Sequence, residues 1–133
     1  MLRPITPPAL PAPLARYSHA VEVPAGARMV FCSGQLAVAP DGSVPEGAEA
    51  QAGLIFAQIA ALLAEAGMGL GDLVRVGAFV TGREHMAGYM RARDRAVGTP
   101  PPASIRINPG VFARLRSFAF NILMANRRSS LRG

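Results

Sequence analysis

The 133-residue chain carries 14 basic and 8 acidic residues, and its formal net charge is +6 at pH 7. This length suits one domain with one hydrophobic core, and Gly, Gln or Arg interrupts each apolar stretch well before it could span a bilayer. All the basic residues are arginine, which excludes chemistry that depends on a lysine, such as a Schiff base.

The location of the protein is predicted from its cysteine content and its first residues. Cys32 is the only cysteine, so no disulfide can form within the chain. Residues 1–13 contain five prolines and lack the continuous apolar region of a signal peptide. We therefore expect a cytoplasmic protein that contacts no membrane. It should form a single domain over residues 1–133, with an extended, irregular segment at residues 1–13.

Two short strands are predicted near the N-terminus. Residues 21–23 alternate apolar and polar side chains, residues 24–27 suit a turn, and residues 28–33 are rich in strand formers. The two strands should therefore pair as a hairpin. The second strand should stop at a pocket, where Ser33, Gly34 and Gln35 offer a hydroxyl, an adaptable backbone and an amide.

A first helix is predicted after the turn at residues 40–43. Ser43 and Glu46 have the spacing of a capping box, and Gly67 suits the position that follows the last helical turn. One side of this helix should be buried because apolar residues recur on it at helical spacing. These residues are Ile55, Ile59, Leu62, Leu63 and Ala66.

The second half of the chain predicts a central strand at residues 73–81 and a second helix at residues 83–97. Met86, Met90 and Val97 form a plausible buried stripe on that helix, which the prolines at 100–102 should end. A strand at residues 103–108, a turn at residues 109–110 and a closing strand at residues 116–125 should follow.

The predicted order is β-β-α-β-α-β-β, an α+β architecture in which both helices cover one face of a mixed sheet. The closing strand is apolar on both sides, so self-association is the simplest way to cover the other sheet face.

Five short motifs stand out along the chain: Tyr17-Ser18-His19-Ala20, Phe31-Cys32-Ser33-Gly34-Gln35, Glu49-Ala50-Gln51, Ala64-Glu65-Ala66-Gly67 and Pro102-Ala103-Ser104. Together they resemble the reactive-intermediate deaminase family, also called the Rid or YjgF-type family. The resemblance implies a chorismate-mutase-like fold, a homotrimer whose sheets form a central barrel, and ligand clefts between subunits. It also implies metal-free hydrolysis of 2-imino or 2-enamino acids to 2-oxo acids and ammonia.

The chain departs from the family pattern at two positions. Ser104 stands where the resemblance implies an arginine for the substrate carboxylate, and Asn121 stands where it implies a glutamate linked to the attacking water. A serine cannot form the charge-assisted fork of a guanidinium, and an asparagine cannot act as a general base. We therefore expect weak or absent standard deaminase activity, and whether the protein is an enzyme stays open.

The candidate catalytic residues are Ser33, Ser104 and Asn121. Arg106 could supply the missing cation, because side chains two apart on a strand point the same way; the alternative is an arginine exposed at a sheet edge. The expected ligand is a small carboxylate, imine or carbonyl metabolite. The candidate substrate-binding residues are Tyr17, Ser33, Gly34, Gln35, Met90, Ser104, Arg106 and Asn121.

The remaining features leave two further function classes beside a divergent deaminase. One is a non-catalytic trimer that binds a small molecule. The other is an RNA-binding, ribonuclease-like or chaperone-like role, which the net charge and the basic tail at residues 127–133 fit but no motif supports, so we do not expect a nucleic acid partner. His19 could act as an acid or base or be structural. Two histidines and one distant cysteine make no metal site, and we expect no metal and no cofactor.

Overall fold

The computed structural model describes residues 2–107 and 119–125, and for residues 106, 107 and 119–125 it defines only the path of the strands. Two single 3₁₀ turns, Leu70–Asp72 and Arg83–His85, precede the strand at residues 73–79 and the helix at residues 86–96. No helix in these ranges is both long and apolar enough to cross a bilayer. The elements are β1 (Arg3–Ile5), β2 (Ala20–Glu22), β3 (Phe31–Leu36), α1 (Ala48–Glu65), β4 (Leu73–Phe79), α2 (Met86–Ala96), β5 (Ala103–Ile107) and β6 (Ala119–Ala125).

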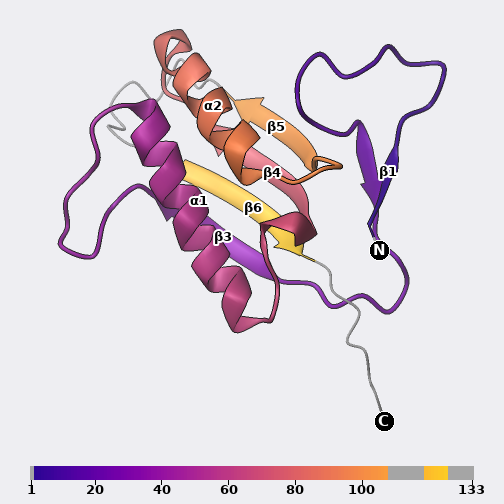
Figure 1. The fold of residues 1–133 in the computed structure, drawn as a ribbon, viewed down its shortest axis with the longest axis horizontal. Helices are drawn as coiled ribbons and strands as arrows, with labels where there is room; N and C mark the ends of the chain where they lie inside the picture. Colours follow the sequence, from indigo (N-terminus) through magenta and orange to yellow (C-terminus); the bar gives the residue numbers. More distant parts are fainter. Residues whose placement is uncertain (1, 108–118, 126–133) are drawn as a thin grey trace.

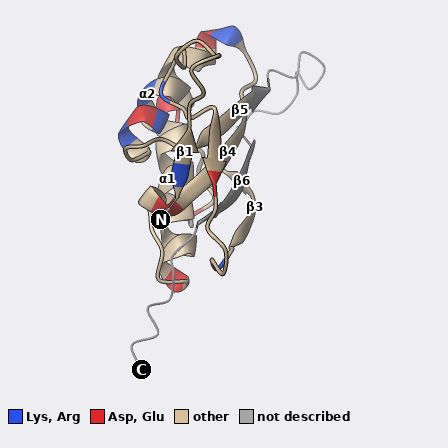
Figure 2. Ribbon diagram, turned by 90° about the vertical axis from the view of Figure 1, so that its right-hand side faces the viewer, with Lys and Arg blue, Asp and Glu red and all other residues tan. Residues whose placement is uncertain are grey.

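The main sheet has the strand order β3-β6-β4-β5. It is mixed, as predicted, because β4 and β5 are parallel while β6 is antiparallel to both of its neighbours. Both helices lie on one face of this sheet, and within the described residues no element covers the other face (Figures 1 and 2). The predicted α+β layers are therefore present, with β4 inside the sheet as expected.

The strands near the N-terminus pair differently from the prediction. The hairpin of residues 21–23 with residues 28–33 is wrong, since β2 pairs with β1 and β3 pairs with β6. The expectation of an irregular segment at residues 1–13 is also wrong for Arg3–Ile5, which forms a strand beside β2 that an Arg3–Glu22 ion pair supports. An alternating pattern marks a strand but does not specify its partner.

The strand β3 runs through the residues that were expected to end it. It continues to Leu36, so Ser33, Gly34 and Gln35 lie inside the strand rather than at its exit. The ladder to β6 shifts register between Cys32 and Gln35, which is the signature of a β-bulge. The prediction that this strand stops at a pocket after residue 33 is therefore wrong, and β3 is a bulged strand at the edge of the sheet.

The start of α1 does not use the predicted capping box. The helix begins at Ala48 after Gly47, and no side chain caps it. The Ser43 hydroxyl instead donates to the Asp41 carboxylate at 2.6 Å. Gly47 has φ 85°, a left-handed conformation that suits glycine and separates Ser43 from the helix.

The core lies between the helices and the sheet. From α1, Ile55, Ile59 and Leu63 are fully buried, as predicted, and Val76 of β4 is buried with them. Leu62 was wrongly placed in this stripe, since it is 43% exposed. A residue three positions from Ile59 is rotated by about 60° around the helix, which takes Leu62 to the edge of the buried face.

The second helix also buries different residues from those expected. Met86 and Met90 are only partly buried and pack against the core, whereas Val97 is buried as predicted. Tyr89 and Arg93 are among the largest fully buried side chains. The burial of Arg93 was not predicted, because an arginine on a helix usually faces solvent. Here its guanidinium pairs with the Asp94 carboxylate at 3.0 Å and lies 6.0 Å from the centroid of the Tyr89 ring.

The end of α1 follows the prediction for Gly67. Its amide donates to Ala64 O at 2.9 Å and the Met68 amide donates to Leu63 O at 2.9 Å, the two hydrogen bonds of a Schellman motif. Gly67 has φ 69°. The glycine therefore ends the helix through its left-handed backbone.

Replacing Gly67 by alanine should lower the free energy of unfolding by about 1–2 kcal/mol, because an L residue is strained in this conformation. A Cβ at this position meets no atom within 4 Å. The loss of stability therefore measures only the strain in the backbone. Urea unfolding of Gly67→Ala should be compared with Gly69→Ala, whose backbone is extended at φ −141°. Equal losses in the two variants would contradict the assignment.

Candidate functional site

One group of candidate residues lies at the β5 edge of the main sheet. Ser18, which follows Tyr17, is buried; its amide donates to Pro102 O at 3.0 Å, and it forms an isolated parallel bridge with Ala103. The half-buried Tyr17 is thereby held beside the start of β5. Ser104 is opposite Val76 in the ladder, and its Oγ is buried without a hydrogen-bond partner in the described part of the chain.

A second group lies at the opposite edge, on β3. Ser33 and Gly34 are exposed, and the Gln35 side-chain amide donates to Ser33 O at 3.3 Å. These residues occupy the bulge, a feature that proteins often place next to active sites. The backbone here is therefore irregular and open to solvent at the position that the family motif marks.

The two groups do not meet within one chain. The order β3-β6-β4-β5 puts three interstrand spacings between them, which is about 14 Å. In the ladder, Arg106 is opposite Ala78 and Asn121 is opposite Gly77. Met90 lies on α2 and packs against the core. The structure thus unites Tyr17 with the β5 residues and separates them from the Ser33 group.

His19 and Cys32 are the titratable residues next to the two groups. The Nε2 atom of His19 is 2.8 Å from Pro11 O, and its ring meets the Tyr17 ring edge-on with centroids 5.8 Å apart. Burial raises the pKa of the Cys32 thiol, so this cysteine is protonated near neutral pH. Among residues 2–107 and 119–125, no three His, Cys, Asp or Glu side chains gather as a metal site would require.

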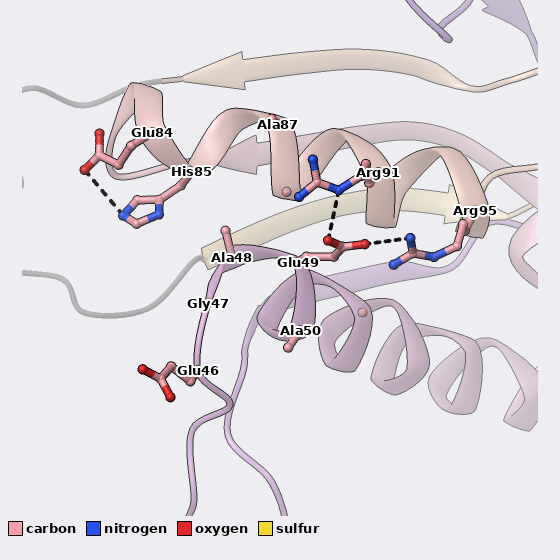
Figure 3. A pocket seen from close by; sticks show the side chains of 12 residues that line it. Glu46, Gly47, Ala48, Glu49, Ala50, Glu84, His85, Ala87, Arg91 and Arg95 are labelled. Atoms are coloured by element: carbon pink, nitrogen blue, oxygen red, sulfur yellow. Dashed lines mark hydrogen bonds and ion pairs between the residues drawn. The ribbon is translucent and has the colours of Figure 1, made fainter.

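A depression that the sequence analysis missed lies between the start of α1 and the helix α2. It has a volume of about 650 Å³ (Figure 3). Arg91 and Arg95 of α2 reach across it to the Glu49 carboxylate, at 2.9 Å and 2.7 Å. Glu49 is thus paired with both arginines, and no local pattern could reveal contacts between residues more than 40 positions apart. We assign it a role in joining the helices.

This pairing should make stability depend on pH. Hydrogen bonds from Arg95 and then Arg91 lower the pKa of the Glu49 carboxyl below its usual value of 4.5. A carboxyl whose pKa is lower in the folded state stabilises the fold above its unfolded pKa, and this contribution disappears as the pH falls through the folded pKa.

The wild-type protein should therefore have a higher urea midpoint than Glu49→Gln near neutral pH, and the difference should shrink as the pH falls below 4.5 and through the lowered pKa of the folded state. Salt at about 1 M should reduce the difference at neutral pH, because the pair is partly exposed. A difference that is constant across this pH range would contradict the prediction.

Two helices cover one face of a four-stranded mixed sheet whose edge strand is bulged, so the fold is a two-layer α+β fold. The sequence profile of the family described as endoribonuclease L-PSP matches residues 8–113. The chain belongs to this family, and the resemblance to the Rid or YjgF-type family is confirmed.

Relatives and solved structures agree with this assignment. A RutC family protein of Aquifex aeolicus (strain VF5) is 37% identical over 81 residues, which cover 60% of this chain and 62% of that protein. The structure of RidA from the Antarctic bacterium Psychrobacter sp. PAMC 21119 has a TM-score of 0.66 and 27% identity, covering 92% of this chain and 98% of that one. YyfB of Yersinia pestis, a protein of unknown function from the conserved Rid family, has a TM-score of 0.75 and 25% identity, and the match covers 95% of this chain and 98% of that one.

Proposed function

We propose that this chain forms a homotrimer and binds a small carboxylate, imine or carbonyl metabolite in clefts between its subunits. The observation that carries the proposal is the division of the family's lining residues between opposite sheet edges. Tyr17 and Ser104 lie at one edge and Ser33 and Gly34 at the other. A single pocket can contain both groups only when the β3 edge of one subunit meets the β5 edge of the next.

The uncovered sheet face supports assembly. Phe31 is 70% exposed, and Leu36 and Ile105 are exposed with it. Ladder partners place Phe31 level with Leu123 and Arg75, on the side away from the helices, whereas Cys32 is level with the buried Val76. Large apolar side chains exposed on a sheet face that no element covers are typical of an interface. A trimeric barrel would bury it.

The chemistry of the cleft follows from Ser104 and Asn121. Without a guanidinium and a carboxylate at these positions, the proposed cleft binds its ligand through hydroxyls and backbone amides, and Arg106 is our candidate for the cation. The protein is then a divergent deaminase-type hydrolase with weak activity. The alternative is a trimer that binds its ligand without catalysis. The cytoplasmic location expected from the single cysteine suits either role.

A coupled assay tests this function. When an amino-acid oxidase supplies a 2-imino acid, the wild-type protein should accelerate release of the 2-oxo acid and ammonia weakly or not at all. The double variant Ser104→Arg with Asn121→Glu should raise the rate, because it restores the anchor and the general base. The double variant adds one positive and one negative charge, so its matched control is Ser43→Arg with Leu62→Glu, which adds the same two charges at exposed positions and should leave the rate unchanged.

Binding of 2-oxobutanoate should be measured in parallel, by ligand-observed NMR, for the wild-type protein and for Arg106→Ala. Weaker binding by Arg106→Ala supports Arg106 as the cation. A wild-type protein that is monomeric at micromolar concentration and binds no small 2-oxo acid would overturn the proposal.

The word endoribonuclease in the family description raises RNA as an alternative ligand. The described arginines do not favour it, because several are already paired: Arg3 with Glu22, and both Arg91 and Arg95 with Glu49. Figure 2 shows acidic and basic residues interspersed on the helices rather than one basic face. Measured RNA binding whose affinity falls steeply with salt would favour RNA over a small molecule as the ligand.

A further inference from the structure

Residues 16–18 form a strap over the connection between α2 and β5. The Arg16 Nη2 atom donates to Val97 O at 3.1 Å, Gly98 O at 3.0 Å and Thr99 Oγ1 at 3.0 Å. Ser18 continues the contact, since its hydroxyl donates to Pro101 O and its amide to Pro102 O. This strap therefore fixes the chain from the end of α2 to the first residue of β5.

Tyr17 lies between the two anchors of the strap. Its ring is half-buried and contacts only the edge of the His19 ring among the described aromatic residues. Arg16 on one side and Ser18 on the other therefore hold the backbone that carries the phenol, and the ring itself packs against His19. Arg16 is suited to this task because its charge lies beside the carbonyl end of α2, where the helix dipole is negative.

We propose that Arg16 is a positioning residue of the cleft, which holds Tyr17 beside the start of β5 and Ser104. The assignment rests on the proposed function, in which Tyr17 and Ser104 line the ligand site. Arg16 itself does not contact the ligand. Its Nη2 atom is bound to the connection at residues 97–99, and it acts through Tyr17.

The position of Tyr17 can be measured without any ligand. The chain has two tyrosines and no tryptophan, and Tyr89 is fully buried. In a Tyr89→Phe background, Tyr17 is the single emitter, and acrylamide quenching reports its solvent access. Arg16→Ala should increase the quenching constant, and Arg16→Lys should restore most of the wild-type value because the ammonium can reach the same carbonyls.

Arg28 provides a matched control. Its Nη2 atom donates to Ala66 O at 2.8 Å, at the carbonyl end of α1. Arg28→Ala therefore removes the same kind of bond from the other helix, and it should lower stability without changing the quenching of Tyr17. If the quenching constant rises equally in Arg28→Ala and Arg16→Ala, the effect is one of general stability and the proposal is wrong.

Titration with 2-oxobutanoate tests whether the strap affects ligand binding in the cleft. Arg16→Ala should raise the Kd by about 3- to 10-fold, the loss expected if the ligand loses one neutral hydrogen bond to Tyr17, and Arg16→Lys should raise it less. Altered quenching with an unchanged Kd would overturn the role in binding. If the wild-type protein binds no 2-oxobutanoate, the proposed function fails, and the quenching data alone then decide whether Arg16 positions Tyr17.

Discussion

The Phe31→Glu variant is expected to be a folded monomer at micromolar concentrations, whereas we propose that the wild-type protein is a trimer under the same conditions. Phe31 is 70% exposed on the open face of β3. In a trimer this side chain would be buried between subunits, and a carboxylate buried there without a partner costs several kcal/mol at each interface. Sedimentation velocity measures the change in mass, and circular dichroism confirms that the variant is folded.

Leu62→Glu is the matched control for this variant. Leu62 is also an exposed apolar residue, but it lies on α1, across the sheet from the open face. The substitution adds the same charge and should leave the trimer intact. A Phe31→Glu protein that sediments as a trimer, or a wild-type protein that sediments as a monomer, would refute assembly through the sheet face and with it the shared cleft.

Replacing Ile59 by alanine should lower the free energy of unfolding by about 2–5 kcal/mol. Ile59 is fully buried between α1 and the sheet, so the substitution leaves a cavity among Ile55, Leu63 and other core side chains that cannot collapse completely. The measurement is urea unfolding in the Phe31→Glu background, because assembly would otherwise make stability depend on protomer concentration.

Leu62→Ala tests the same prediction from the other direction. Leu62 is 43% exposed although the sequence pattern grouped it with Ile59. Its truncation removes fewer contacts and should cost less than about 1 kcal/mol. Similar losses for the two variants would mean that α1 packs against the sheet in a different rotation.

Only part of the candidate site could be predicted from the sequence. The motifs marked Tyr17, Ser33 and Ser104 as family positions, but nothing in their spacing showed that Ser33 lies at the opposite sheet edge from the other two. The strap formed by Arg16 was also hidden, since its partners are more than 80 positions away. Local patterns carry no information about such contacts.

The sequence by itself determined where the two helices and the strands of the main sheet lie, the left-handed end of α1 at Gly67 and the membership of the family, but not the strand β1. These properties depend on the periodicity of apolar residues and on backbone preferences, which act over a few neighbouring residues. The tertiary structure alone decided that β3 pairs with β6 rather than β2 and that Arg93 is buried while Leu62 is exposed. Strand partners and burial depend on which distant surfaces meet, and their free energy arises only when the whole core is packed.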